Sequence, residues 1–428
     1  MVNLQEKSQA NSILPPGELI LKQLGLDPTK LKLIKPSYRS HYRAVINWLT
    51  KYQPNPDVTN LEKVKGLLES FDHLCEVEDW RIATKLPYIQ LETGSQFHWQ
   101  LYIWSYFREL ISLHSKLITI TRETGDRQGE SYALGNLGNV YDKMGRFEKA
   151  VSFHQQALVV SRDIGDRLGE GQDLGNLGLA YYGLGHYDQA INFHQQYLNI
   201  AREISHRHSE GIALNNLGLA YKSLGQYEQA IYFHKQSLVV YRETGNRQGE
   251  AQALGNLGLV YKSLRHYLQA IDYNQQYLTI VRLIGDKSGE AIALGNLGDV
   301  SFALGDYSKA LELQNQKLVI SREIGARSRE GAALASLGEI SIKIGKFTEA
   351  SCYLQEALEI CREVSNRANE SETLKCLAEL NHALGEVEVA RQYCQQAIAL
   401  ATELGIPLAT ECEVLLLKIK NDNGREGQ

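Results

Sequence analysis

The sequence predicts an all-α protein, a right-handed superhelical solenoid built from helix-turn-helix hairpins. The motif LGNLG at 134–138 returns at 174–178, 254–258 and 294–298, with LNNLG at 214–218. An alanine in the following segment keeps the same 40-residue spacing from Ala150 to Ala390. Because a fixed period of this length is typical of stacked helical hairpins, we predict seven repeats over residues 125–404.

Each repeat contains two helical segments. Leu134, Leu137 and Tyr141 follow one another at steps of three and four, which places them on one stripe of a helix that we name helix A. Residues 147–161 have the same period and form helix B. Gly145 lies between the two helices, where a residue able to take positive φ can end helix A.

Glycine also defines the other turns. The glycine of Gly145 recurs at Gly185, Gly225, Gly305, Gly345 and Gly385, whereas Arg265 departs from the pattern. At the junction between repeats, Gly125 precedes Asp126, a pairing of a C-terminal glycine with an N-capping residue. Gly138 is expected to face Ala150, so that helices A and B approach closely.

The ends of the array differ from its centre. We expect a helical N-terminal region over 1–84, with helices at 37–53 and 58–76, and a degenerate repeat over 85–124. Trp99 and Trp104 in that repeat indicate a cap or a specialised contact. A capping helix is expected over 405–420, after Pro407, and a disordered tail over 421–428.

Composition narrows the possible functions. The net charge of -5 gives no global reason to expect nucleic acid or a membrane as a partner. No window reaches ~18 consecutive apolar residues and no signal peptide is evident, so a cytoplasmic protein is expected. The six cysteines form no CxxC pair and read as core residues in a reducing compartment. No GxxxxGK[ST], HExxH or GxSxG motif is present, so we expect no enzyme, cofactor or metal site.

A ladder of asparagines marks one face of the A helices. It comprises Asn136, Asn176, Asn216, Asn256 and Asn296, off the leucine stripe. An amide side chain offers a donor and an acceptor together, so the ladder could pair with the backbone of a bound peptide. The alternative is that each asparagine bridges adjacent A helices and only shapes this face.

The positions around the ladder vary between repeats. Leu179, Leu219 and Leu259 indicate an apolar strip, and the later carboxylates Asp299, Glu339 and Glu379 favour a basic ligand segment. Lysines one turn further along could meet ligand carboxylates or could simply be solvated. The predicted peptide-binding set is Tyr132, Asn136, Asn139, Lys143, Gln172, Asn176, Leu179, Asn216, Leu219, Lys222, Gln252, Asn256, Leu259, Lys262, Asn296 and Asp299.

Repeated histidines and charges receive structural interpretations. His154, His194 and His234 would suggest a metal site, but their successors Asn274, Gln314, Leu354 and Cys394 favour packing instead. Arg122, Arg127 and their equivalents are expected to pair with Glu130 and its equivalents at the repeat junctions. Exposed pairs of this kind contribute at most ~1 kcal/mol each.

The order Leu137, Gly138, Tyr141, Gly145, Phe147, Ala150 and Ala157 resembles the tetratricopeptide signature. The long repeat looks most like those of kinesin light chains and spindle-orientation adaptors, and many cyanobacterial repeat proteins are similar. This resemblance implies a non-enzymatic scaffold that binds a protein or peptide partner along a concave groove lined by the A helices. It also implies that the ladder asparagines contact the ligand.

Two other functions stay open. Residues 17–65 hold nine Lys or Arg against four Asp or Glu, so a ligand-responsive regulator could contact nucleic acid through this region. Resemblance alone suggests the second, a sensor arm beside a signalling NTPase.

Overall fold

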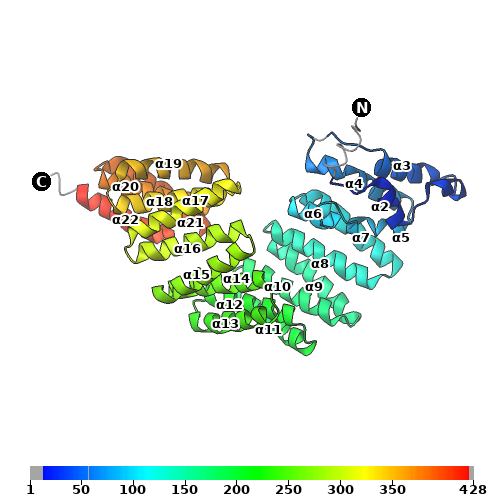
Figure 1. Cartoon of the computed structure of the whole chain (residues 1–428), viewed down its shortest axis with the longest axis horizontal. Helices are drawn as coiled ribbons and strands as arrows, with labels where there is room; N and C mark the ends of the chain where they lie inside the picture. The colour runs from blue at the N-terminus through cyan, green and yellow to red at the C-terminus, as the bar shows by residue number, and fades with distance from the viewer. Residues whose placement is uncertain (1–12, 56, 424–428) are drawn as a thin grey trace. The chain divides into compact units, whose positions relative to one another are not determined.

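The chain folds into helices joined by short turns (Figure 1). The computed structural model describes residues 13–55 and 57–423. The only β pairing within these ranges is an isolated bridge between Gln90 and Gln96, which confirms the all-α prediction. The chain divides into two compact units, residues 1–209 and 210–428, and each is described by itself.

The N-terminal region is a small group of closely crossing helices. It contains α2 (Gly17–Leu24), the 3-10 helix η1 (Pro28–Leu33), α3 (Arg39–Thr50) and α4 (Asn60–Glu76). The last two are the helices predicted at 37–53 and 58–76. A Cβ on Gly17 would lie 2.3 Å from the Leu49 carbonyl oxygen, and one on Gly66 would lie 2.7 Å from that of Trp48. Glycine therefore permits both crossings.

The segment predicted as a degenerate repeat, 85–124, has a full-length second helix and a short first helix. It follows α5 (Trp80–Ala83) and contains η2 (Leu86–Tyr88), α6 (Phe97–Ile103) and α7 (Phe107–Thr124). Helix α6 has only seven residues, because the segment before it forms a turn closed by the Gln90–Gln96 bridge. Ser105 takes a φ of 64° between α6 and α7, as Gly145 does at 70° in the next hairpin.

Seven regular hairpins follow. Their A and B helices are α8 (Arg127–Lys143) and α9 (Phe147–Asp163), α10 (Arg167–Gly183) and α11 (Tyr187–Glu203), α12 (Arg207–Ser223) and α13 (Tyr227–Glu243), α14 (Arg247–Ser263) and α15 (Tyr267–Leu283), α16 (Lys287–Ala303) and α17 (Tyr307–Glu323), α18 (Arg327–Lys343) and α19 (Phe347–Glu363), and α20 (Arg367–Ala383) and α21 (Val387–Leu404). The predicted caps are confirmed at the first junction, where Gly125 has a φ of 72° and the Asp126 carboxylate accepts from the Gly129 N–H at 2.9 Å.

Helices A and B pack against each other through a histidine and a glycine. A Cβ on Gly138 would lie 2.5 Å from Cε1 of His154, a residue with no exposed surface. The prediction that Gly138 faces Ala150 is therefore wrong about the nearest neighbour, because His154 lies one turn beyond Ala150 and its ring covers the glycine. The same arrangement pairs Gly178 with His194.

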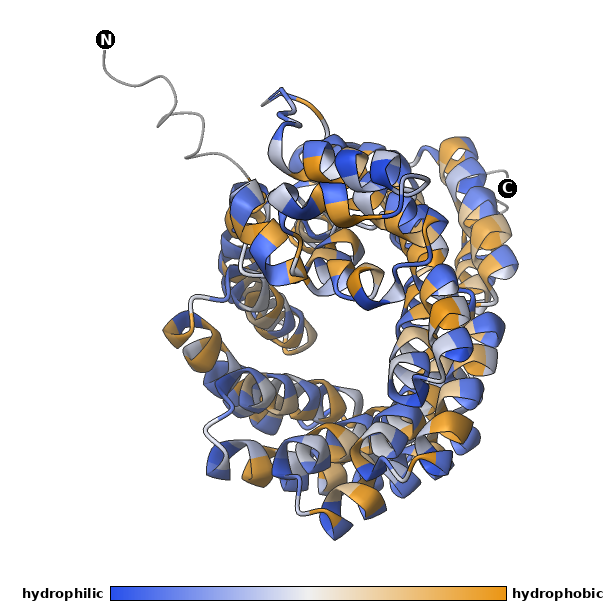
Figure 2. Ribbon diagram, turned by 90° about the vertical axis from the view of Figure 1, so that its right-hand side faces the viewer, coloured by the Kyte–Doolittle hydropathy of each residue, from blue (hydrophilic) through white to orange (hydrophobic). Residues whose placement is uncertain are grey.

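A continuous apolar core holds the first unit together. Its buried side chains extend from Ile20 in α2 through Leu67 and Leu110 to Leu137 in α8. The N-terminal region and the first repeats thus share one core. Figure 2 shows apolar and polar residues alternating around the helices, as expected for helices that bury one stripe.

The end of the array is covered by α22 (Leu408–Asn423). Cys412 and Ile419 are buried in the core that α22 shares with α20 and α21, as a capping helix requires. The helix begins directly after Pro407 and runs three residues past the predicted end at 420. Of the predicted tail, residues 424–428 lie outside the described part of the chain.

All six cysteines lie in the described part of the chain and are free thiols. Cys361, Cys394 and Cys412 are buried, whereas Cys352 is exposed. The prediction of six core residues is wrong for Cys352, which faces away from the buried side of α19.

The repeat junctions are held by paired arginines around a buried carboxylate. Glu130 is only 3% exposed and accepts from Arg122 Nε at 2.6 Å and from Arg127 Nη1 at 2.5 Å. The predicted ion pairs are confirmed, but their carboxylate is buried rather than exposed. In the next repeat, burial acts to raise the pKa of Glu170, and hydrogen bonds from Arg162 and Arg167 outweigh it and lower that pKa.

Candidate functional site

One face of the A helices carries side chains that vary from repeat to repeat. We define the A-helix wall as the residues in register with Tyr132, Asn136, Asn139 and Asp142, which helical geometry places on one side of α8 and its equivalents. Tyr132 is 57% exposed and Leu179 is 45% exposed. Adjacent A helices contact each other directly within each unit, as α14 and α16 do. Wall residues of neighbouring repeats therefore lie side by side.

The asparagine ladder is partly engaged in contacts inside the protein. Asn256 Nδ2 donates to Asn215 Oδ1 on α12 at 3.0 Å, and Asn296 Nδ2 donates to Asn274 Oδ1 on α15 at 3.0 Å. The first contact is the predicted bridge between adjacent A helices, and the second joins helix A to a B helix instead. Asn136 differs, because its Nδ2 is buried without a partner. Ligand contact by the ladder stays a prediction.

The leucines of the wall are less exposed in the second unit than in the first. Leu219 and Leu259 are half-buried, whereas Leu179 of the first unit is exposed. Gln172 and Gln252, in register with Tyr132, are exposed polar residues. The wall thus offers small apolar areas flanked by amides.

The three predicted lysines occupy two different registers. Lys222 and Lys262 are in register with Asp142, one residue before the register of Lys143. Lys262 Nζ lies 2.7 Å from Asp299 Oδ2, so these two wall residues pair with each other. Burial lowers the pKa of Lys222, and the nearby Lys262 lowers it further. Lys143 Nζ lies 4.4 Å from the centroid of the Tyr102 ring.

Carboxylates gather on the wall towards the C-terminus. Burial raises the pKa of Glu339 on α18, and the charge of Glu379 on α20 raises it further. Burial also raises the pKa of Glu372. Lys343 and Lys375 counteract the shift of Glu339, and Lys375 counteracts that of Glu372, although the Lys375 ammonium group is also bound to Glu411 at 2.5 Å. The predicted acidic end therefore combines the half-buried Glu339 and Glu379, whose charges repel each other, with the exposed Glu372.

The repeated histidines are packing residues, as predicted. His154, His194 and His234 have no exposed surface. Burial lowers the pKa of His194 to about 4 and that of His234 to about 3, so both are neutral near pH 7. Within the described ranges, no three His, Cys, Asp or Glu side chains are grouped so as to hold a metal ion.

The N-terminal basic segment uses part of its charge internally. Arg39 donates from Nε to the Ile34 carbonyl at 2.8 Å and from Nη2 to the Lys32 carbonyl at 2.7 Å. Lys30 Nζ lies 3.5 Å from Asp27 Oδ2. Contact of this region with nucleic acid stays a prediction. Over the described residues, no helix is both long enough and apolar enough to span a membrane.

Two wall residues upstream of the regular repeats were not predicted as such from the sequence, although Trp99 was assigned to a cap or a specialised contact. A step of 40 residues back from Asn139 and Asp142 leads to Trp99 and Tyr102 on α6. Trp99 is 47% exposed, and its ring stacks on that of Tyr102 with centroids 4.9 Å apart. The repeat spacing could have identified both, although LGNLG is absent from this segment.

The family model of the tetratricopeptide repeat matches residues 129–203, 209–283 and 289–363, just over half of the chain. The protein therefore belongs to the tetratricopeptide repeat family, as the sequence predicted. A comparison with curated proteins finds no match.

Solved structures show the same fold at low sequence identity. Aspartyl phosphate phosphatase F from Bacillus subtilis is 15% identical, with 94% of this chain and 96% of that chain covered and a TM-score of 0.57. The apo form of the quorum sensor NprR from B. thuringiensis is 18% identical, with 80% and 99% covered and a TM-score of 0.55. A Signal Transduction ATPase with Numerous Domains, with a tetratricopeptide repeat sensor, from Pyrococcus horikoshii is 17% identical, with 90% and 56% covered and a TM-score of 0.58.

Proposed function

We propose that the protein is a non-enzymatic scaffold whose A-helix wall binds an extended segment of a partner protein. In the second unit, the carboxylates of Glu339 and Glu379 receive basic side chains of that segment, whereas Asp299 is already paired with Lys262. The amides of Asn256 and Asn296 contact its backbone, because each amide nitrogen and oxygen can make further hydrogen bonds beyond the one in the free protein.

The grouping of Glu339 with Glu379 carries this proposal. Glu339 is half-buried, and burial and the nearby charge of Glu379 both disfavour its charged form, which Lys343 and Lys375 offset only in part. A lysine or arginine from a ligand would remove that repulsion and would gain a charge-assisted hydrogen bond. The arrangement therefore favours a basic peptide over a neutral or acidic one.

The proposal is tested by selecting heptapeptides from a random displayed library on the immobilised full-length protein. Isothermal titration calorimetry then measures the affinity of the selected peptides for the wild type and for the double variant Glu339→Ala/Glu379→Ala. We expect selected peptides to be rich in Lys and Arg, and the double variant to bind them about tenfold more weakly at low salt, because charge pairs at an interface contribute about 1.5 kcal/mol or more.

A matched control is Glu359→Ala, which removes an exposed carboxylate from helix B of the same hairpin as Glu339. This control should bind as the wild type does. Equal affinity of the double variant, with an unchanged circular dichroism spectrum, would exclude the acidic part of the wall as the binding surface.

A further inference from the structure

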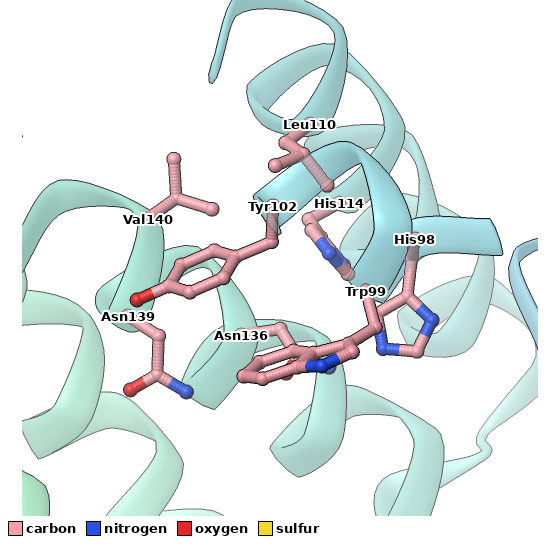
Figure 3. A pocket seen from close by; sticks show the side chains of 8 residues that line it. All are labelled: His98, Trp99, Tyr102, Leu110, His114, Asn136, Asn139 and Val140. Carbon is pink, nitrogen blue, oxygen red and sulfur yellow. The ribbon is translucent and has the colours of Figure 1, made fainter. Parts of the chain in front are cut away.

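The first unit contains a narrow pocket where the degenerate repeat meets the first regular one (Figure 3). Helices α6, α7 and α8 enclose it. It is lined by His98, Trp99, Tyr102, Leu110, His114, Asn136, Asn139 and Val140. At the positions of His98 and Trp99 the regular hairpins have no aromatic side chain, whereas Tyr182 and Phe302 occupy the register of Tyr102.

The pocket follows from two substitutions at the contact between helices A and B. His98 occupies the register of Gly138, and Leu110 occupies that of Ala150. In a regular hairpin, glycine at the first position lets the histidine ring of helix B lie against the backbone of helix A. In the degenerate repeat, the His98 and His114 rings meet edge to face with centroids 5.8 Å apart. Two large side chains therefore stand where a regular hairpin has two small ones.

Two polar atoms at the base of the pocket have no partner. His114 is 1% exposed, and its Nδ1 makes no hydrogen bond, a feature that it shares with Nδ1 of His154 and His194 in the regular hairpins. Asn136 Nδ2 is also buried and unpaired. The equivalent nitrogens of Asn256 and Asn296 both donate to another amide. A buried polar group without a partner costs about 1–3 kcal/mol, so a ligand that supplies the missing partners would gain that free energy.

The mouth of the pocket is aromatic. The Trp99 indole and Asn136 both line the pocket (Figure 3), and the indole stacks on Tyr102 with an angle of 13° between the rings. Half of the Trp99 surface is open to solvent. The exposed part of the indole therefore offers a flat apolar surface to a group that approaches Asn136.

Charges beside the pocket favour a neutral ligand. Lys143 Nζ lies 4.4 Å from the Tyr102 ring centroid and 3.3 Å from the Tyr102 carbonyl oxygen, so a positive charge lies beside the ring. Burial raises the pKa of the Tyr102 hydroxyl, and the nearby charge of Asp142 raises it further, so a negative charge lies beside the same ring. Because the two charges are of opposite sign, they offset each other and give an ionised ligand no net attraction.

We propose that this pocket binds an uncharged aromatic side chain of the ligand. The ring stacks on Trp99, and the adjoining peptide carbonyl accepts a hydrogen bond from Asn136 Nδ2. The inference rests on the proposed function in one respect only, namely that the ligand is a polypeptide.

The test uses blocked amino acids as probes on the full-length protein. Indole N–H signals of protein labelled with ¹⁵N-tryptophan are recorded during titration with N-acetyl-phenylalaninamide, N-acetyl-leucinamide and N-acetyl-lysinamide. The Trp99 signal is assigned by its loss in Trp99→Phe. We expect the phenylalanine probe to shift the Trp99 signal at the lowest concentration, the leucine probe to need more, and the lysine probe to leave it unchanged.

Asn136→Ala and Asn176→Ala form a matched pair, since both remove a ladder amide but only Asn136 lines the pocket. The first should weaken binding of the phenylalanine probe about fivefold, which corresponds to the loss of one ordinary hydrogen bond, and the second should not change it. A Trp99 signal that no probe shifts, or that all three shift equally, would overturn the inference. Neither result would affect the binding of basic peptides to the second unit, so this failure is distinguishable from failure of the proposed function.

Discussion

Arg265 is held in a backbone conformation that L-residues rarely adopt. Its φ is 59°, in the position where the other regular hairpins have glycine with φ between 70° and 80°. A non-glycine residue with this φ destabilises the folded protein by roughly 1–2 kcal/mol. Replacing it with glycine would recover only part of this free energy, because glycine loses more conformational entropy on folding. We expect Arg265→Gly to stabilise the second unit by about 0.5–1 kcal/mol in urea unfolding followed by circular dichroism.

The reciprocal exchange is Gly225→Ala at the same position of the preceding hairpin, where φ is 74°. It should destabilise the second unit by about 1 kcal/mol. A lower unfolding midpoint for Arg265→Gly than for the wild type would show that the arginine side chain makes a compensating contact.

Two glycines three residues apart on α8 should respond in opposite ways to alanine. A Cβ on Gly138 would lie 2.5 Å from the His154 ring, whereas a Cβ on Gly135 would meet nothing closer than Asp173 Oδ1 at 3.7 Å. Gly138→Ala should therefore cost about 1–3 kcal/mol through overpacking. Gly135→Ala should stabilise the first unit by about 0.5–1 kcal/mol, because alanine is the better helix former. Thermal unfolding of both variants measures the difference, and equal midpoints would contradict it.

For single residues, the roles of those that repeat could be predicted from the sequence, and the roles of those that break the repeat could not. The cap at Asp126 followed from its sequence context alone, because capping depends on neighbours along the chain. The predicted nearest neighbour of Gly138 was wrong, because the actual neighbour depends on how far the His154 ring on the facing helix extends. Trp99 was taken as part of a cap or specialised contact, whereas its register places it on the A-helix wall.

Among the elements, α10 carries a buried charge that its equivalents lack. Asp173 is 6% exposed, in the register where α8 and α14 have Ala133 and Ala253. Ser161 Oγ donates to Asp173 Oδ2 at 2.7 Å. Burial raises the pKa of Asp173 to about 7, despite the hydrogen bond from Ser161. The carboxyl group is therefore half protonated near neutral pH.

The raised pKa of Asp173 predicts that the free energy of unfolding of the first unit depends on pH. Because the folded pKa of Asp173 is raised, its protonated form contributes stability that is fully present below the unfolded pKa and is lost as pH rises through about 7. Between pH 5 and pH 8 the loss should be about 2–3 kcal/mol. Asp173→Ala should remove this dependence and should be more stable than the wild type at pH 8.

Urea unfolding at several pH values measures this effect. Asp163→Ala is a suitable comparison, because Asp163 is an exposed partner of Arg127 in the same unit. A wild-type stability that does not fall between pH 5 and pH 8 would mean that Asp173 stays ionised in the folded protein.

Helices with a strong period were predicted closely, and the irregular helix was not. The seven hairpins and the helices α3 and α4 agree with the prediction to within a few residues. Helix α6 is shorter than the helix A of a regular repeat, because the residues that precede it form a turn and an isolated bridge instead of further helix. No periodic apolar stripe precedes Phe97, so the sequence contains no signal from which the start of α6 could be set.

At the scale of the whole molecule, repetition determines the fold and variation determines the wall. The chain belongs to the tetratricopeptide repeat family, and its repeated residues are those that pack, turn and cap the hairpins. Buried positions of the B helices also change between repeats, as at His154, Asn274 and Leu354, but the changing residues of the A-helix wall, from Trp99 to Glu379, are exposed or half-buried. Because a ligand can reach these wall side chains, we expect them to determine which ligand binds.

The two units carry different chemistry on this wall. The first has the exposed aromatic rings of Trp99 and Tyr132, and the second has the carboxylates of Glu339 and Glu379.

The most direct test of the account is the site of contact of a bound peptide. A selected basic heptapeptide carrying a photoreactive benzoylphenylalanine is bound to the full-length protein, irradiated, and the cross-linked residues are identified by mass spectrometry. The account predicts cross-links on α16, α18 and α20, close to Asp299, Glu339 and Glu379. An excess of the same peptide without the photoreactive group should prevent these cross-links. Specific cross-links confined to the B helices or to residues 13–84 would contradict it.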